Sequence, residues 1–593
     1  MTTTLSATSR PRVLGWVRSA SFLDGDWGTS IAYVLGISFT LAGYSSFWHL
    51  MMMLGLTTLV ALNYVTICRL YPNGGGVYSS VYHRSRTFAV VGALLLGADY
   101  VITMSLSVLD AFHYFNFAHP NLWAIGIIIG LGLFNWFGPK HSGGMAFAIS
   151  LLTLLTLLVL IAASAPTALA TTHIAPAAGG FFKNWGIFVG IILSISGIEA
   201  ISNMTGLMKD PARDSRRAIL AVLAKVIIAT IFLGLAMHAV PQLTGHTEDM
   251  VRFLGEHYVA NWFGWIVAFA LGLLLISAGN TALNGLISIQ FLMSVDNELP
   301  AFLRRLNRYG VPVLPLIIAT LAPVVVLMIT HDILILAHLY AIGVVGAVLI
   351  NIGSTATDPQ HKLPRLTRIL MTISAVVLFF VELSIIIEKP QATLFASVIL
   401  FVGLGARYLA IRKAGAELEY AVEPAAVRSR RRQRDTPPSA KFLVAVRGKS
   451  EQLLRFAISE AKAYNALLLV LRVKEIAVGT LPEKILLVSS DTDDWIEKIC
   501  SKAGIDFQLI VFASNEVGYT ISEQAALFGV DRVIMGVTRR GIMETALKGD
   551  VIRVVGHLLP EEIQLVIFGG GADLLVRTSE NAPSPTPEEA TQH

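Results

Sequence analysis

Long apolar segments separated by short polar loops fill the first 413 residues of the chain. An α-helix of about 20 residues crosses the hydrocarbon core of a bilayer, and most of these segments reach that length. The pattern therefore predicts an all-α membrane domain, residues 1–413, with twelve transmembrane helices. The predicted helices cover residues 28–44, 47–69, 87–113, 121–138, 143–165, 182–205, 216–240, 257–285, 312–330, 332–354, 366–387 and 391–411.

Composition and charge agree with a membrane protein. Hydrophobic residues make up 54% of the chain and charged residues 14%, whereas soluble domains carry about 25% charged residues. Basic residues are concentrated before the first predicted helix and after each even-numbered one. By the positive-inside rule, this alternation places both termini in the cytoplasm. The basic residues concerned are Arg10, Arg12, Arg18, Arg69, Arg84, Arg86, Lys140, Lys209, Arg213, Arg216, Arg217, Arg304, Arg305, Arg308, Lys362, Arg365, Arg368, Arg412 and Lys413.

Three carboxylates interrupt the apolar segments. Asp26 lies between two glycines at the start of the first helix, Asp99 lies in the middle of the third, and Glu199 follows a glycine in the sixth. A charge at bilayer depth costs about 3 kcal/mol, so these side chains should face a cavity or a partner. Glycine beside an acid in two corresponding helices also predicts broken helices around a midplane cation site. The alternatives are a helix-capping role for Asp26 and buried acids that only hold helices together.

Hydroxyl groups accompany these acids. Asp99, Thr103 and Ser107 are spaced by four residues and therefore share one helix face. Tyr33 lies about two turns beyond the first acid, on the same face of a regular helix. Asp110 lies near the outer end of the third helix, where we expect it to be solvated. Carboxylates and hydroxyls along the inner faces of membrane helices indicate a cation pathway.

Three motifs resemble those of a known transporter superfamily. The run Gly25–Ser30 is similar to the first-helix signature of the KUP potassium-uptake proteins, and more closely to that of their KimA-type relatives. Pro72–Tyr78 resembles the loop after the second helix in the wider amino acid–polyamine–organocation (APC) superfamily. Lys209–Arg217 resembles the loop after the sixth helix in the same superfamily.

The resemblance implies a fold and an ion site. The fold would be a 5+5 inverted repeat of the APC/LeuT type plus two helices, and the activity proton-coupled potassium import by a homodimer in a bacterial plasma membrane. Either Glu199 or Asp99 would carry the coupled proton, while Asp26 would stay ionised against potassium. No cofactor is implied, because potassium is the substrate. The potassium ligands would be Asp26, Tyr33, Asp99, Tyr100, Thr103, Ser107, Ser196, Glu199 and Tyr340.

Two other functions stay open on the sequence. An APC-type proton-coupled amino-acid permease would bind a substrate carboxylate at the first helix break, where Asp26 would repel it. A sensor would use the membrane domain as a receptor for the cytoplasmic domain, but three intramembrane acids on a repeated scaffold argue against it. An enzyme is not expected, because the sequence offers no nucleophile–base pair, metal cluster or phosphate-binding loop motif.

The residues after 413 divide into three parts. A basic linker at 414–440 would be solvated or attracted to anionic membrane lipid, and no nucleic-acid motif accompanies it. Residues 441–575 alternate strands with helices, which predicts a parallel α/β sheet, and residues 576–593 are expected to be a disordered tail. The predicted strands are Phe442–Val446, Ala466–Arg472, Phe507–Phe512, Arg532–Met535 and Gln564–Phe568, and the predicted helices cover 450–463, 493–503, 517–528 and 549–558.

The C-terminal domain resembles the universal-stress-protein fold, which KimA-type importers also carry. Nucleotide binders of that family have an acidic residue after the first strand, where this chain has Arg447 and Lys449, so ATP is not expected. Together with Arg539, Arg540 and Gly549 near the start of the last helix, these cations would suit an anionic regulator. By resemblance the candidate is cyclic di-AMP, an inhibitor of potassium importers. The alternative is a dimerisation module without a ligand.

Overall fold

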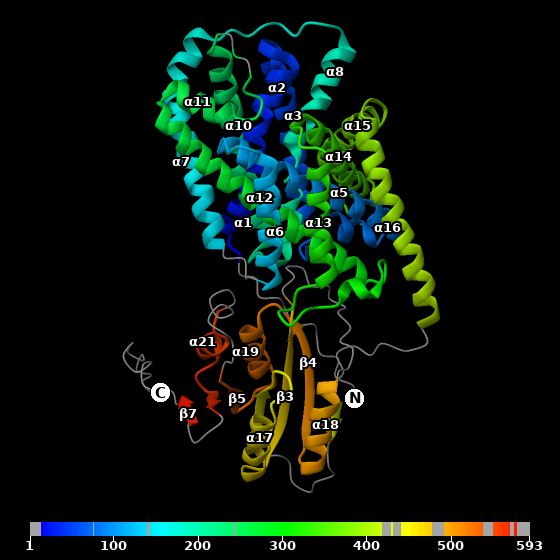
Figure 1. Ribbon diagram of the computed structural model, residues 1–593. Coiled ribbons are helices and arrows are strands. Elements are labelled where there is room, and N and C mark those ends of the chain that lie inside the picture. The colour runs from blue at the N-terminus through cyan, green and yellow to red at the C-terminus, as the bar shows by residue number, and fades with distance from the viewer. Residues whose placement is uncertain are drawn as a thin grey trace.

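A computed structural model shows a helical part followed by a mixed α/β part (Figure 1). Arg539 and Arg540, most of the predicted linker and the predicted tail beyond residue 577 lie outside the described residues. The structure describes residues 14–74, 76–138, 143–241, 243, 245–417, 428–430, 440–476, 491–537, 549–569 and 574–577.

Apolar helices build the first part of the chain, each ending at a polar or glycine-containing loop. Short 3-10 helices, labelled η, connect or interrupt several of them. The α-helices are α1 (Trp16–Asp24), α2 (Ser30–Ala42), α3 (Ser46–Leu70), α4 (Gly76–Tyr82), α5 (Arg86–Tyr114), α6 (Pro120–Trp136), α7 (Gly143–Thr171), α8 (Phe181–Gly190), α9 (Ala200–Met204), α10 (Pro211–Ala239), α11 (Met250–Tyr258), α12 (Asn261–Val295), α13 (Val313–Ile329), α14 (Ile333–Ala356), α15 (Arg365–Glu388) and α16 (Pro390–Glu417).

Eight of the described helices are long and apolar enough to cross a membrane, or nine if the bent pair Phe181–Gly190 and Ile192–Leu207 is one span. Helices α6 and α13 are also apolar but shorter, with 17 residues each. One of the eight, Trp27–Leu70, contains η2 (Gly43–Ser45), where the sequence predicts a boundary between two helices. The protein is therefore a multi-pass membrane protein, and the number of twelve spans stays a prediction.

Helix α5 forms the centre of the helical part. In its most apolar stretch 94% of the residues are buried, against 22% in α7, 28% in α15 and 17% in α16. It packs against α6, α12, α13, α14 and α16. Leu155, Phe379 and Phe401 are among the apolar side chains that the peripheral helices expose. Exposed apolar faces are stable in lipid, so the peripheral helices mark the lipid boundary and α5 the protein interior.

A seven-stranded sheet organises the C-terminal part. Its order is β1-β4-β3-β2-β5-β6-β7; the five central strands are parallel, and β1 and β7 pair antiparallel at the edges. The five parallel strands are those predicted from the sequence. The edge strands were not predicted, because three or four residues show no periodicity. The strands are β1 (Arg428–Arg430), β2 (Ala440–Ala445), β3 (Ala466–Glu475), β4 (Phe507–Ser514), β5 (Arg532–Gly536), β6 (Gln564–Phe568) and β7 (Leu574–Arg577).

Helices cover both faces of this sheet, as a parallel sheet requires. One face packs Val444 of β2 against α17 (Glu451–Ala463) and α18 (Asp491–Ala503). The other face packs Leu443 against α19 (Val517–Phe528) and α21 (Val551–Leu558). Successive residues of β2 thus enter opposite cores. The parallel α/β sheet is confirmed, whereas the universal-stress-protein fold stays a resemblance.

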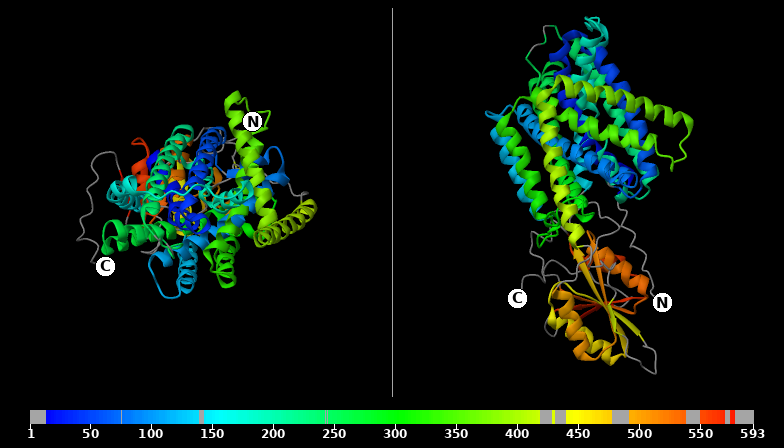
Figure 2. Two further views of the ribbon diagram at one scale, coloured as in Figure 1. Left: turned by 90° about the horizontal axis from the view of Figure 1, so that it is seen from above. Right: turned by 90° about the vertical axis from the view of Figure 1, so that its right-hand side faces the viewer.

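The carboxyl ends of the central strands face the helical part. Ile476, directly after β3, is buried in an apolar cluster with Phe291 and Val295 near the end of α12. The side views place the sheet at one end of the helix bundle (Figure 1; Figure 2, right). We call this end of the bundle the sheet end and the opposite one the far end.

Helix α5 begins at the sheet end. Arg407 of α16 donates a hydrogen bond to Thr87 in the first turn of α5. The same guanidinium lies 2.6 Å from Glu298, just beyond the end of α12. Since α12 ends against the sheet, α5 runs from the sheet end towards the far end, where Tyr114 is its last residue.

Candidate functional site

Two helices are interrupted inside the bundle, at the glycine-containing stretches where the sequence predicts breaks. Helix α1 ends and α2 begins on either side of η1 (Trp27–Thr29). Helix α8 is followed by η3 (Ile192–Ile195) and an irregular turn before α9, with a bend of 48°. Main-chain groups at such breaks are released from the regular helix ladder and become able to meet an ion or substrate.

Gly197 brings the two breaks into direct contact. Its φ is +88°, a left-handed conformation that glycine adopts readily. A Cβ at this position would lie 2.5 Å from the main-chain nitrogen of Trp27 and 2.7 Å from its Cα. The second break therefore packs on the backbone next to Asp26, a closeness that only glycine permits.

Gly197→Ala is expected to destabilise the protein by about 3 kcal/mol, because a left-handed backbone costs about 1–2 kcal/mol and the steric overlap a similar amount. The melting temperature of the detergent-purified protein measures this loss. Gly55→Ala in α3 is the matched control, since a Cβ there meets nothing within 4 Å. Equal melting temperatures for the two variants would contradict the contact between the breaks.

Asp26, Asp99 and Glu199 meet at these breaks. Their exposed fractions are 4%, 1% and 4%, and the three carboxylates interact electrostatically with one another. The Gly197 amide donates to Oε1 of Glu199 at 3.2 Å. One oxygen of each acid, namely Oδ2 of Asp26, Oδ2 of Asp99 and Oε2 of Glu199, has no hydrogen-bond partner in the described structure. Among the described residues, no cationic side chain forms an ion pair with any of the three.

Asp26 lacks the bond that would make it a helix cap. It precedes η1, but within this described stretch its side chain accepts no hydrogen bond from that helix's amides. Asp210, by contrast, does cap a helix, because its side chain accepts a hydrogen bond from the Arg213 amide at 3.1 Å. The capping alternative for Asp26 is therefore not supported.

Hydroxyl groups line the space beside these acids. The Ser196 Oγ lies 2.5 Å from the Tyr340 Oη and 3.4 Å from Oδ1 of Asp99. The Tyr33 hydroxyl lies close to the side chains of Thr29 and Tyr340. Three helices and the second break thus contribute oxygen atoms to one small region, as the sequence predicts for a cation site.

Close packing of α14 on α5 sets the position of Tyr340. A Cβ at Gly343 would lie 2.7 Å from the main-chain nitrogen of Asp99, so the two helix backbones nearly touch there. Tyr340 lies three residues earlier on the same face of α14. This contact brings its hydroxyl to Ser196 at the second break.

The other predicted ligands lie close by on α5. The Tyr100 hydroxyl accepts a hydrogen bond from Nδ2 of Asn203 at 2.7 Å and interacts electrostatically with all three acids. Thr103 donates to the main-chain oxygen of Asp99 at 2.8 Å. Ser107 is buried one turn further along the same face. The predicted polar face of α5 is therefore present, although the Thr103 hydroxyl group uses its proton in a hydrogen bond to the main chain.

A buried ion pair that was not predicted from the sequence lies just before the first break. Lys225 Nζ in α10 lies 2.6 Å and 2.7 Å from the two carboxylate oxygens of Asp24, and Ser150 of α7 donates to Oδ2 at 2.6 Å. Lys225 is a single charged residue in the middle of the seventh apolar segment. A charge at bilayer depth is costly, so the criterion that identified the three acids would also have identified Lys225. The pair fixes α1 against α7 and α10.

Asp110 corrects a second expectation. Its position near the end of α5 predicts a solvated side chain, whereas the side chain is completely buried. The reason is that α11, which lies far along the chain, and α2 cover this end of α5: Tyr114 donates to the main-chain oxygen of Ala32 at 2.6 Å, and Arg252 of α11 donates to that of Tyr114 at 3.0 Å.

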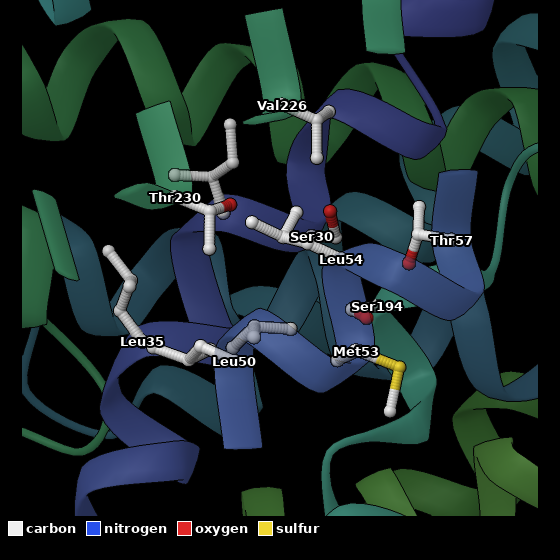
Figure 3. A pocket seen from close by; sticks show the side chains of 11 residues that line it. Ser30, Leu35, Leu50, Met53, Leu54, Thr57, Ser194, Val226 and Thr230 are labelled. Atoms are coloured by element: carbon white, nitrogen blue, oxygen red, sulfur yellow. The ribbon is translucent and has the colours of Figure 1, made fainter. Parts of the chain in front are cut away.

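A narrow cavity adjoins the two breaks (Figure 3). It has a volume of about 10 Å³, the scale of a single water molecule. Ser30, Thr57, Ser194 and Thr230 contribute hydroxyls to its largely apolar wall. The hydroxyls of Thr57 and Ser194 have no hydrogen-bond partner among the described residues. The cavity therefore suits a water molecule or a small ion rather than a larger solute.

In the α/β part, two of the predicted anion-binding residues lie at the carboxyl edge of the sheet. Arg447 and Lys449 are exposed just after β2. The chain leaves β2 towards β3 on one side and later returns to β5 on the other, so this edge is a topological switch point, where ligands of such sheets bind. Gly549 has a φ of +74° and precedes Asp550, which caps α21.

Comparison with known proteins identifies a family for the membrane-spanning part. A family model described as amino acid permease matches residues 14–405. The matched region covers more than half of the chain and contains both helix breaks, the three acids and Tyr340. It ends within α16 and does not reach the sheet.

Proposed function

Because the chain belongs to the amino acid permease family of the APC superfamily, we propose that it is a secondary active importer of potassium ions coupled to protons. The family and the membrane-spanning helices make the protein a transporter rather than an enzyme. The proposal concerns the substrate and the coupling. It rests on one observation, the three buried carboxylates that meet at two broken helices without a cationic partner among the described residues.

The arrangement favours a cation as the substrate. Buried carboxylates are unfavourable unless a cation or a proton compensates them, and three of them attract positive charge strongly. The ligands are carboxylate, hydroxyl and main-chain oxygens from Asp26, Tyr33, Ser196 and Tyr340. Potassium is a large, weakly hydrated ion that suits several such oxygens better than a tight cage. The carboxylate of Asp26 among these ligands disfavours an anionic substrate.

Proton coupling is supported by the crowding of Glu199 and Asp99, which are buried and interact electrostatically with each other and with Asp26. Like charges in a buried site disfavour one another, so one carboxyl group of such a cluster can hold a proton. We propose that this proton travels with potassium, carried by Glu199 or Asp99. If Glu199→Gln kept the pH dependence of uptake seen in the wild type, Asp99 would be the carrier.

The remaining parts of the proposal concern location, assembly and regulation. The protein would act as a homodimer in a bacterial plasma membrane, with the sheet end and both termini in the cytoplasm. Arg447, Lys449 and Gly549, together with the undescribed Arg539 and Arg540, would bind an anionic nucleotide such as cyclic di-AMP at the sheet's carboxyl edge. The contact of Ile476 with α12 offers a route from that edge to the transporter.

The second candidate is a proton-coupled amino-acid permease, which the family match itself favours. Main-chain groups at the two breaks would bind the substrate's ammonium and carboxylate groups. Asp26 would then lie beside the substrate carboxylate and repel it.

Flux measurements in proteoliposomes decide between the candidates. Purified protein is reconstituted, a proton gradient is imposed, and uptake of potassium and of a labelled amino-acid mixture is followed. We expect gradient-driven potassium uptake that a protonophore abolishes, and no amino-acid uptake above protein-free vesicles. Amino-acid uptake without potassium uptake would reject potassium import and establish the permease.

A further inference from the structure

Another buried acid, without a cationic partner among the described residues, lies outside the central site. Asp110 of α5 is 0% exposed, yet neither of its carboxylate oxygens has a hydrogen-bond partner among the described residues. The three acids of the central site each leave one oxygen unpartnered, whereas Asp110 leaves both. A buried carboxylate with no donor is strongly unfavourable, so this position calls for a bound cation or a proton.

Acidic groups act electrostatically on Asp110. Glu248 and Asp249, directly before α11, interact electrostatically with it. Their side chains are 46% and 34% exposed, so they lie where solvent reaches the far end. Each contacts a histidine: His113 lies 2.6 Å from Glu248, and His246 lies 3.0 Å from Asp249. Acidic side chains thus extend from solvent to the buried carboxylate.

The nearby arginine does not neutralise this group. Arg252 of α11 lies 2.9 Å from Glu256, donates to the main-chain oxygen of Tyr114 at 3.0 Å, and stacks over the ring of Trp265 at 4.5 Å. Its guanidinium is therefore engaged elsewhere, and no ion pair with Asp110 is present in the described structure. Asp110 therefore has no cationic partner among the described residues.

Asp110 is connected to the central site through Tyr33. The Tyr33 hydroxyl, which belongs to the central site, interacts electrostatically with both Asp26 and Asp110. Asp110 is also on the polar face of α5, since the eleven residues from Asp99 make about three turns and about 16 Å along the helix. The same face then carries Asp99, Thr103 and Asp110 in succession from the middle of the bundle to the far end.

We propose that Asp110 is a second cation-binding site, which takes a monovalent alkali cation from the far end and passes it by Tyr33 to the three central acids. Glu248 and Asp249 form the mouth of this site. Their negative potential raises the local cation concentration. The inference rests on the proposed cation transport, but it assigns a separate site whose binding can be measured without transport.

Transport kinetics provide the first test. In proteoliposomes, Asp110→Asn should raise the KM for potassium about tenfold, the effect of losing one charge–cation contact, and leave the maximal rate within about twofold. Glu382→Gln in α15 is the matched control, because it also neutralises a membrane carboxylate with an unpartnered oxygen. An unchanged KM for Asp110→Asn, equal to that of the control, would overturn the proposal.

Equilibrium binding separates this inference from the proposed function. Radioactive rubidium binding to the detergent-purified protein should show one ion fewer per chain in Asp110→Asn than in Glu382→Gln. If the wild type imports amino acids and no potassium, potassium import is rejected, and rubidium binding alone still decides the Asp110 site. Equal rubidium binding by both variants would reject the site whatever the substrate.

Two further variants distinguish the loss of a cation site from a folding defect. Asp110→Glu keeps the charge and should restore part of the rubidium binding that Asp110→Asn loses. Glu248→Gln changes a half-exposed side chain, so it should fold normally and raise the KM for potassium about two- to threefold through the weaker local potential. Wild-type kinetics in Glu248→Gln, with no recovery in Asp110→Glu, would mean that Asp110 has only a structural role.

Discussion

Replacing Lys225 by methionine is expected to lower the free energy of unfolding by about 3–5 kcal/mol, because it leaves Asp24 buried without its cation. The side chains of Lys225 and Asp24 are only 10% and 3% exposed, and Nζ lies 2.6 Å from the carboxylate. Ser150 donates one further hydrogen bond, which cannot compensate a full negative charge. Thermal unfolding of the detergent-purified protein should show a much lower melting temperature.

The double variant Lys225→Met/Asp24→Asn is the control for this prediction. It removes both charges, so most of the lost stability should return if the loss comes from an unpaired carboxylate. Recovery would show that the pair matters through charge compensation. A melting temperature that is unchanged in Lys225→Met, or equally low in the double variant, would contradict this explanation.

The ion pair also bears on the first helix break. A Cβ at Gly28 would lie 2.1 Å from Oδ1 of Asp24, so the carboxylate packs directly on the break. Asp24 thereby holds the end of α1 against α7 and α10 while η1 turns away. We therefore regard Asp24 and Lys225 as positioning residues for Asp26, not as ligands of the transported ion.

Asp26→Asn should reduce gradient-driven potassium uptake at least about 100-fold, equivalent to about 3 kcal/mol, the scale of a charge at bilayer depth. Asparagine has nearly the same shape, and Asp26 forms no ion pair among the described residues. The folded structure should therefore survive, with a melting temperature close to that of the wild type. The initial rate of potassium uptake in proteoliposomes measures the effect.

Asp210→Asn is the matched control. Asp210 caps α10 by accepting a bond from the Arg213 amide, and asparagine caps a helix about as well as aspartate. Uptake by this variant should equal that of the wild type. If Asp26→Asn also transported normally, Asp26 would have no role as a potassium ligand and the amino-acid permease would become the better proposal.

The sequence by itself determined the class of the protein and most of its elements. Hydropathy reports whether a segment can be buried in lipid, and lipid forces each such segment to be a helix. The five parallel strands were found for a related reason, since short β-rich runs between helices have few other arrangements. Asp26, Asp99 and Glu199 stood out because a carboxylate in an apolar segment is costly wherever the helix packs.

Only the tertiary structure decided which side chains meet. Lys225 and Asp24 form an ion pair although 201 positions of the chain separate them. Gly197 packs on Trp27, although hydropathy assigns these two residues to separate helices and says nothing of a contact between them. The sequence predicts a solvated Asp110 because it gives the position of this residue along α5 but not the packing of α11 over that end of the helix. Hydropathy averages over neighbours in sequence, whereas burial and charge compensation depend on neighbours in space. The sequence could therefore name the acids, but only the packed helices show which of them lack a partner.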